Sequence, residues 1–285
     1  MDQDRNSFED MAQERPRGRL RLMRVPQPGF RPEDTFEYVD DRTGEQLAWS
    51  GVELRENAEM YPGRPLRVRI RLEGEDTDAV AGAALARARE LCRAAKAPAR
   101  IYVSCSPEDA ALVRSLADLG FRDDDGQVRM RRELSDPREK GHLPPGCVMV
   151  NDALELSEER RFFLERYNRL YAAHRDQAWL DAFTDRDDFL RIMAVASNGL
   201  VNETVVWREG ETGVVGYIQT AHRWRRKGVA TQMLSYAARY FMEIGLKEMT
   251  SVVHVRVPGL LRTFEGAGFR QEQLLLRYPG MDYDV

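Results

Sequence analysis

A run of seven residues late in the chain combines three cations with a glycine in a pattern suited to phosphate: Trp224-Arg-Arg-Lys-Gly-Val-Ala230. The apolar run before it, from Gly213 to Thr220, has the composition of a strand, and Thr231 to Met242 has helical spacing. A short turn between a strand and a helix presents free N–H groups and the positive helix end to an anion. Because cations at a helix N-terminus oppose the helix dipole, a bound anion resolves the conflict. The run therefore predicts a pyrophosphate-binding turn.

The elements around this turn follow a regular order. Before it we expect a strand at 147–150, a helix from Ser157, a second broken helix over 178–183 and 186–190, and strands at 192–196, 201–207 and 214–220. After it we expect a helix over 231–244 that stops at Gly245, a strand at 250–255, a short helix at 260–266 and a strand at 273–278.

The first half of the chain repeats the end of this order. Strands at 66–72, 100–104 and 127–134 alternate with helices at 79–95 and 107–117. Aligning Leu119-Gly120-Phe121 with Ala267-Gly268-Phe269 brings the elements of both halves into register, which indicates an internal duplication. We expect a disordered tail at 1–18, a first domain at 19–134, a Pro- and Gly-rich linker at 135–146 and a second domain at 147–285.

This order, with Arg225, Gly228 and Ala230 in the turn and the later Gly268-Phe269 pair, resembles the GNAT superfamily of acyl-CoA-dependent N-acetyltransferases. The resemblance implies a mixed α/β fold (α+β mixed sheet) built as two tandem GNAT-like acyl-CoA N-acyltransferase folds. It also implies acetyl-CoA as co-substrate. The residues expected to bind it are the strand end and the turn, namely Ile218, Gln219, Thr220, Arg225, Arg226, Lys227, Gly228, Val229 and Ala230.

The matching position in the first half is acidic. Glu73-Gly-Glu-Asp-Thr-Asp78 places four carboxylates where the second half has its cations, and these would repel a pyrophosphate. We expect a degenerate first copy that has lost the cofactor and serves as structural support or as part of the wall of the acceptor site.

Candidate acid and base groups lie on the neighbouring strands. Glu203 and His254 are the predicted catalytic residues, with a satisfied structural role as the alternative for each. Tyr217 and His222 are further candidates, with a core position for Tyr217 and a surface position for His222 as the alternatives. The resemblance implies a tyrosine that protonates the leaving thiolate, but Phe264 stands there, and Val257 and Pro258 replace an asparagine common in the family. The acidic segment with Asp181, Asp185, Asp187 and Asp188 could attract an amine, but a solvated helix end is the favoured interpretation.

The composition excludes several classes of protein. Lys and Arg number 43 against 47 Asp and Glu, so the net charge of −4 gives no overall attraction to nucleic acid or to a membrane. Three cysteines and four histidines lack the spacing of a metal site or a disulfide framework. No apolar run reaches the roughly 18 residues of a membrane span. We expect a cytoplasmic monomer or homodimer without metal.

The sequence leads to two hypotheses of different class. The first is an N-acetyltransferase that moves an acetyl group from acetyl-CoA directly to a primary amine of a small molecule or a protein. The second is an acyl-CoA-binding regulatory or assembly module with little turnover, which Phe264 favours.

Overall fold

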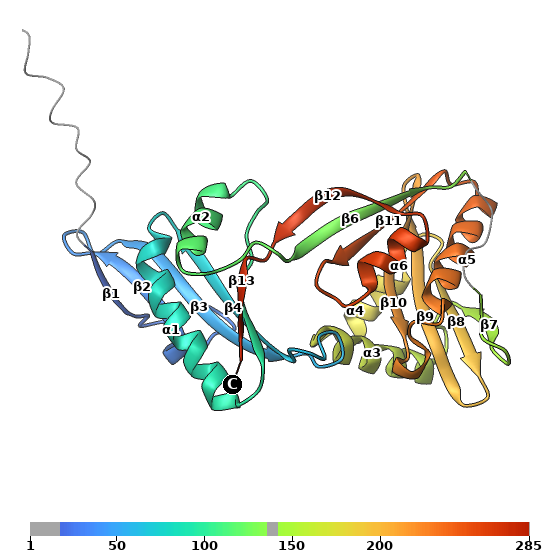
Figure 1. Ribbon diagram of the computed structural model, residues 1–285, viewed down its shortest axis with the longest axis horizontal. Coiled ribbons are helices and arrows are strands. Elements are labelled where there is room, and N and C mark those ends of the chain that lie inside the picture. Colours follow the sequence, from blue (N-terminus) through green and yellow to red (C-terminus); the bar gives the residue numbers. More distant parts are fainter. Residues whose placement is uncertain (1–17, 136–141, 285) are drawn as a thin grey trace, which may run out of the picture.

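The computed structural model describes residues 18–135 and 142–284. Two halves are visible in Figure 1, each a mixed sheet with helices packed against it. The predicted tail at 1–18 lies outside the described residues except for Gly18, which begins the first strand, and so do residues 136–141 of the predicted linker.

The first half contains a six-stranded sheet in the order β1-β2-β3-β4-β5-β13. Only β4 and β5 pair in parallel among these strands. The alanine side chains of α1 form a narrow face, and Ala84 and Ala88 are fully buried against the sheet. The elements of this half are β1 (Gly18–Leu22), a 3-10 turn (Pro32–Asp34), β2 (Thr35–Asp40), β3 (Gln46–Glu56), β4 (Leu66–Gly74), α1 (Thr77–Ala95), β5 (Ala99–Val103) and α2 (Ala110–Asp118).

The second half contains a seven-stranded sheet in the order β12-β6-β11-β10-β9-β8-β7. Its largest apolar cluster forms where α5 packs on the sheet, with Met233, Ala237 and Phe241 buried at helical spacing. The elements are β6 (Gly126–Glu133), β7 (Val148–Asp152), α3 (Ser157–Tyr171), α4 (Gln177–Thr184), β8 (Leu190–Ala196), β9 (Gly199–Glu209), β10 (Thr212–Thr220), a 3-10 turn (His222–Trp224), α5 (Val229–Glu243), β11 (Glu248–His254), α6 (Leu260–Gly266) and β12 (Arg270–Arg277). The strand that follows them, β13 (Gly280–Tyr283), belongs to the first sheet.

Two strands cross from one half to the other. β6 follows the first half in sequence but lies between β11 and β12 of the second sheet. β13 comes at the end of the chain but pairs with β5 of the first sheet, with Gly280 opposite Tyr102. Figure 1 shows β6 and β12 side by side in the bridge between the halves. The strand predicted at 127–134 is therefore present as β6, but it belongs to the second sheet.

Corresponding turns in the two halves have the same backbone geometry. Gly120 has φ +90° and Gly268 has φ +92°. In each half the next residue, Phe121 or Phe269, donates its N–H to a carbonyl five residues earlier, at 3.0 Å. A left-handed glycine that ends a helix in this way is a Schellman-type cap. The alignment that predicted an internal duplication thus corresponds to matched local structure.

Most predicted elements of the second half are present, with one error. α4 ends at Thr184, and the predicted continuation over 186–190 is not helical, because Leu190 already belongs to β8. Arg208 fixes this segment by donating its backbone N–H to the carbonyl of Asp187 at 2.7 Å and by pairing with Asp188 at 2.7 Å. Contacts to the end of β9 therefore override the weak helical pattern. Within the described residues no helix is both long and apolar enough to cross a membrane.

Candidate active site

A cleft of about 810 Å³ opens in the second half where β10 and β11 separate. The two strands pair in parallel from Thr212 opposite Glu248 to Val215 opposite Ser251, and their pairing ends there. Beyond that point β10 remains paired with β9 on its other side, after a bulge between Val215 and Tyr217. The edge of β10 that faces β11 is thus available to an extended ligand from the bulge to Thr220.

Gly216 makes the bulge possible. A Cβ atom at this position would lie 1.8 Å from the ring of Trp207 on β9, well inside contact distance. Trp207 is itself buried and donates its indole N–H to Glu209 at 2.7 Å, so the ring has little freedom to move. A glycine is therefore required where the strand departs from its regular course.

The predicted phosphate turn leads from the end of β10 into α5. Gly228 is the N-cap of α5 with φ +77°, and Arg226 also has a positive φ of +59°. The first N–H used within the helix is that of Gln232, which donates to the carbonyl of Gly228 at 3.0 Å. By helix geometry the N–H groups of Val229, Ala230 and Thr231 have no intrahelical acceptor. The first turn carries no acidic residue, so its dipole is free to attract an anion.

The cations of this turn differ in their surroundings. Arg225 lines the cleft and donates its Nε to the carbonyl of Thr220 at 3.1 Å, which ties the turn to the strand end. The Lys227 ammonium lies 4.7 Å from the centre of the Trp224 ring. All the predicted cofactor residues line the cleft except Lys227: Ile218, Gln219, Thr220, Arg225, Arg226, Gly228, Val229 and Ala230.

Glu203, a predicted catalytic residue, does not line the cleft. Its side chain is fully buried and accepts two hydrogen bonds from Arg166, at 2.6 and 3.0 Å. Arg191 donates a third at 3.3 Å, and its guanidinium also pairs with Glu159 at 3.0 Å. These hydrogen bonds hold the carboxylate away from the cleft, so it cannot contact a ligand bound there. This geometry assigns Glu203 to the packing of α3 on the sheet.

His254, the other predicted catalytic residue, lines the cleft at the end of β11. Burial, with a smaller contribution from Arg67, lowers the pKa of the imidazole below its ordinary 6.5, although Asp125 opposes this shift. Its Nε2 lies 3.0 Å from the amide of Gln127, and its buried Nδ1 has no hydrogen-bond partner within the described residues. Gln127 belongs to the crossing strand β6, so the first half of the chain supplies the residue that orients this histidine.

The remaining polar candidates fit a proton-transfer role less well. Tyr217 lines the cleft, but burial raises its pKa well above 10, and its hydroxyl donates to Gln219 at 2.5 Å. His222 lines the cleft beside the phosphate turn. Phe264 is in the cleft wall, is 1% exposed and packs edge-on against Phe269. The position of the expected tyrosine is therefore occupied by an apolar wall.

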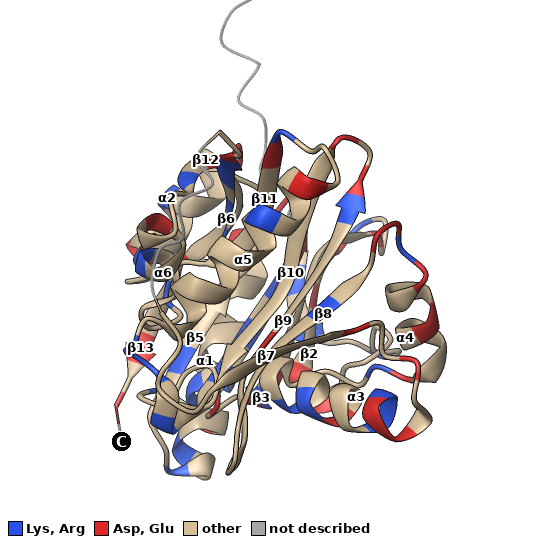
Figure 2. Cartoon of the chain, turned by 90° about the vertical axis from the view of Figure 1, so that its right-hand side faces the viewer, with Lys and Arg blue, Asp and Glu red and all other residues tan. Residues whose placement is uncertain are grey.

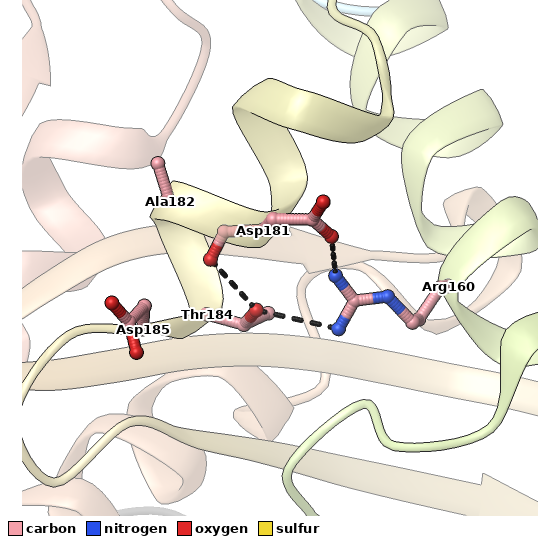
Figure 3. A pocket seen from close by; sticks show the side chains of 5 residues that line it. All are labelled: Arg160, Asp181, Ala182, Thr184 and Asp185. Atoms are coloured by element: carbon pink, nitrogen blue, oxygen red, sulfur yellow. Dashed lines mark hydrogen bonds and ion pairs between the residues drawn. The ribbon is translucent and has the colours of Figure 1, made fainter.

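The acidic segment near α4 is largely neutralised by arginines. A separate hollow of about 350 Å³ lies beside α4. Figure 3 shows that Asp181 and Thr184, which line it, both contact Arg160. Asp187 and Asp188 pair with Arg208. Figure 2 shows acidic and basic residues interleaved around α3 and α4. The favoured interpretation of this segment as a solvated helix end agrees with these contacts.

The equivalent turn of the first half is closed by backbone. A Cβ atom at Gly74 would lie 2.3 Å from the carbonyl oxygen of Leu47 on β3, and that oxygen accepts the N–H of Glu75 at 3.0 Å. Glu73 accepts the indole N–H of Trp49 at 3.1 Å. The carboxylates and the approach of β3 leave this turn unsuited to a phosphate.

One wall of the second-half cleft comes from the first half, which the sequence did not specify by residue. Glu59, Met60 and Pro62, from the connection between β3 and β4, line it together with Tyr167 and Tyr171 of α3. No local pattern in the sequence marks these residues, because their role depends on how the two halves pack.

The cleft between the separating strands β10 and β11 is elongated and ends at the open N-terminus of α5, a geometry suited to a long phosphorylated ligand. Residues 149–269 match the family model described as Acetyltransferase (GNAT) family. Together with the two mixed sheets and the matched glycine turns, this indicates two GNAT-like halves in tandem.

No curated protein matches the sequence. Among solved structures, a GCN5-related N-acetyltransferase from Sphaerobacter thermophilus is similar at 15% identity and a TM-score of 0.49, over 90% of this chain and 84% of that one. A probable N-acyltransferase from Enterococcus faecalis V583 has 10% identity and a TM-score of 0.49, over 86% and 61%. A tandem GNAT protein from the clavulanic acid biosynthesis pathway has 15% identity and a TM-score of 0.42, over 89% and 84%. Likenesses at this distance support no statement about activity.

Proposed function

We propose that the second half binds acetyl-CoA and transfers its acetyl group directly to a primary amine. The observation that carries this proposal is the separation of β10 from β11 next to the open N-terminus of α5. The pyrophosphate would lie on the N–H groups of Val229 to Thr231, and the pantetheine arm along the free edge of β10. The match of residues 149–269 to the acetyltransferase family model supports the choice of co-substrate.

The transfer needs one proton acceptor and no covalent enzyme intermediate. The amine nitrogen attacks the thioester carbonyl carbon, the C–S bond breaks, and the amine gives up a proton as the new C–N bond forms. Strand-edge N–H groups near Ile218 would stabilise the charge that develops on the carbonyl oxygen. Holding the amine beside the thioester supplies much of the rate enhancement.

We assign the proton acceptor to His254. Because a side-chain amide can turn to present either its oxygen or its NH₂ group, Gln127 can accept a hydrogen bond from Nε2–H of the imidazole. In that tautomer the buried Nδ1 keeps a lone pair with no partner within the described residues, and a water molecule admitted with the ligand would carry the amine proton to it. The lowered pKa keeps the imidazole neutral near pH 7. The protonated imidazole or water then returns the proton to the leaving thiolate.

Phe264 supports the alternative proposal of an acyl-CoA-binding module with little turnover, because the cleft wall offers no proton donor at that position. One experiment separates the two proposals. Thiol release from acetyl-CoA is measured against a panel of amines, and the products are identified by mass spectrometry. An acetylated amine supports the transferase. Tight acetyl-CoA binding without thiol release across the panel supports the binding module, and no binding at all refutes both.

A further inference from the structure

One part of the cleft is built from both halves of the chain. Tyr167, Tyr171 and Tyr217 line it together with Glu59 and Met60 from the connection between β3 and β4. Tyr217 follows the bulge at which β10 separates from β11, so this part of the cleft is where an acceptor would meet the acyl group.

The connection that carries Glu59 is held firmly in place. The Asn57 side chain accepts the N–H of Met60 at 3.0 Å, and the Asn57 carbonyl accepts the N–H of Tyr61 at 3.0 Å. Met60 is 9% exposed and belongs to the same apolar cluster as Phe163 of the second half. Glu59 is therefore positioned by packing and by hydrogen bonds of the backbone.

Glu59 is held at the cleft wall by one neutral and one charged partner. Gln219 of β10 donates an amide hydrogen to one carboxylate oxygen, and Arg169 lies 3.2 Å from the other. The Glu59 side chain is 27% exposed, whereas that of Arg169 is 67% exposed. An ion pair with so exposed a partner is weak, so a ligand cation can take the place of the arginine.

The neighbouring tyrosines provide a surface for the carbon chain of a cationic ligand. The ring centres of Tyr167 and Tyr171 are 4.6 Å apart, and Tyr167 is stacked on Tyr217 at 5.9 Å. Aromatic faces pack against methylene groups and attract ammonium groups. Tyr217 also donates its hydroxyl to Gln219, so the strand that borders the acyl site is linked through Gln219 to Glu59.

We propose that the acceptor is a small diamine, with its second ammonium group on Glu59 and its carbon chain on Tyr167 and Tyr171. This inference rests on the proposed acetyl transfer. The amine nitrogen that attacks must be neutral, so it is not the group that pairs with the Glu59 carboxylate. The carboxylate instead binds a second, charged ammonium group at the end of the acceptor that does not react. The cleft of about 810 Å³ has to hold the pantetheine arm as well, which suits a small molecule.

The test compares wild type, Glu59→Gln and the matched control Glu56→Gln, which removes an exposed carboxylate at the end of β3 outside the cleft wall. The probes are 1,4-diaminobutane and butylamine, which differ by one ammonium group. Calorimetry measures the binding of each probe to protein saturated with CoA, and thiol release measures kcat/KM for each. Acetyl-CoA affinity and the melting temperature are recorded for all three proteins.

Wild type and Glu56→Gln should prefer 1,4-diaminobutane to butylamine by at least about 10-fold, and Glu59→Gln should lose that preference while keeping its acetyl-CoA affinity. Equal preference in wild type and Glu59→Gln would show that Glu59 only joins the two halves and would overturn the inference, with acetyl transfer left standing. Failure of wild type to bind 1,4-diaminobutane would overturn it too, because calorimetry does not depend on turnover. Loss of acetyl-CoA binding in wild type would instead refute the proposed function.

Discussion

Replacing Gly228 with glutamate should remove acetyl-CoA binding without unfolding the protein. Gly228 has φ +77°, and an L-residue in this left-handed conformation costs about 1–2 kcal/mol of stability. The new carboxylate would also face the phosphates at the start of α5. Two unit charges about 4 Å apart repel by about 4 kcal/mol at an effective dielectric constant near 20. Screening at an open turn reduces this to about 3 kcal/mol, which is roughly 100-fold in affinity.

Gly245 provides the matched control at the other end of the same helix. It has φ +86°, and a Cβ atom there would meet nothing within 4 Å. Gly245→Glu therefore carries a similar backbone cost, with a carboxylate at the unfavourable end of the helix dipole. Calorimetric titration with acetyl-CoA should show weakened binding for Gly228→Glu alone, while thermal denaturation should show comparable losses of stability. Unchanged affinity in Gly228→Glu, or an equal loss in both variants, would refute the phosphate assignment.

Three further substitutions test the site. His254→Gln should lower kcat by about 100-fold and remove the acidic limb of the pH profile of kcat. Since burial lowers the imidazole pKa, wild type should lose activity only as the pH falls below the ordinary pKa of 6.5. An acidic limb that is unchanged in the variant would exclude His254 as the proton acceptor. Glu203→Gln should lower the free energy of unfolding by about 3 kcal/mol while leaving acetyl-CoA affinity intact, whereas a catalytic role would lower kcat at unchanged stability. Gly216→Ala should cost about 1–3 kcal/mol in thermal denaturation because its methyl group collides with the neighbouring indole, and Gly266→Ala, with open space around its Cβ, should cost much less.

The sequence predicted the parts of the fold that depend on local pattern. The helix that buries Met233, Ala237 and Phe241, and the glycine turn before it, are both visible as spacing of residue types. β2 was not assigned, although its buried and half-buried residues alternate over Thr35–Phe36-Glu37-Tyr38, a signal that could have identified it. β1 gives a weaker signal, because most of its residues are exposed at the edge of the sheet.

The pairing of strands between the two halves could not be predicted from local sequence pattern. The residues of β6 alternate between buried and exposed, as in any strand with one face packed, and this pattern suits either sheet. The choice of sheet depends on contacts between segments far apart in the chain. β13 is short and begins at the glycine of the Pro279-Gly280 pair, which predicts a turn, so no local pattern indicates that it pairs with β5.

The candidate site was predictable to the same extent. The phosphate turn is one continuous segment, so its residues could be named from the sequence, and most of them line the cleft. His254 could be named because it lies on the next strand, but its partner Gln127 could not, since it arrives on a crossing strand. Glu203 was a reasonable candidate until its two arginine partners were known.

The exchange of strands also determines the order in which the two halves can be finished during synthesis. The first sheet needs β13, which follows the strands of the second sheet in sequence, so β5 keeps an open edge until the second half has been made. The second sheet, by contrast, includes β6, which is made before its other strands. Domains generally fold in order from the N-terminus during synthesis, but here the N-terminal sheet is completed after the second sheet. Loss of β13 should therefore damage the half that was made first.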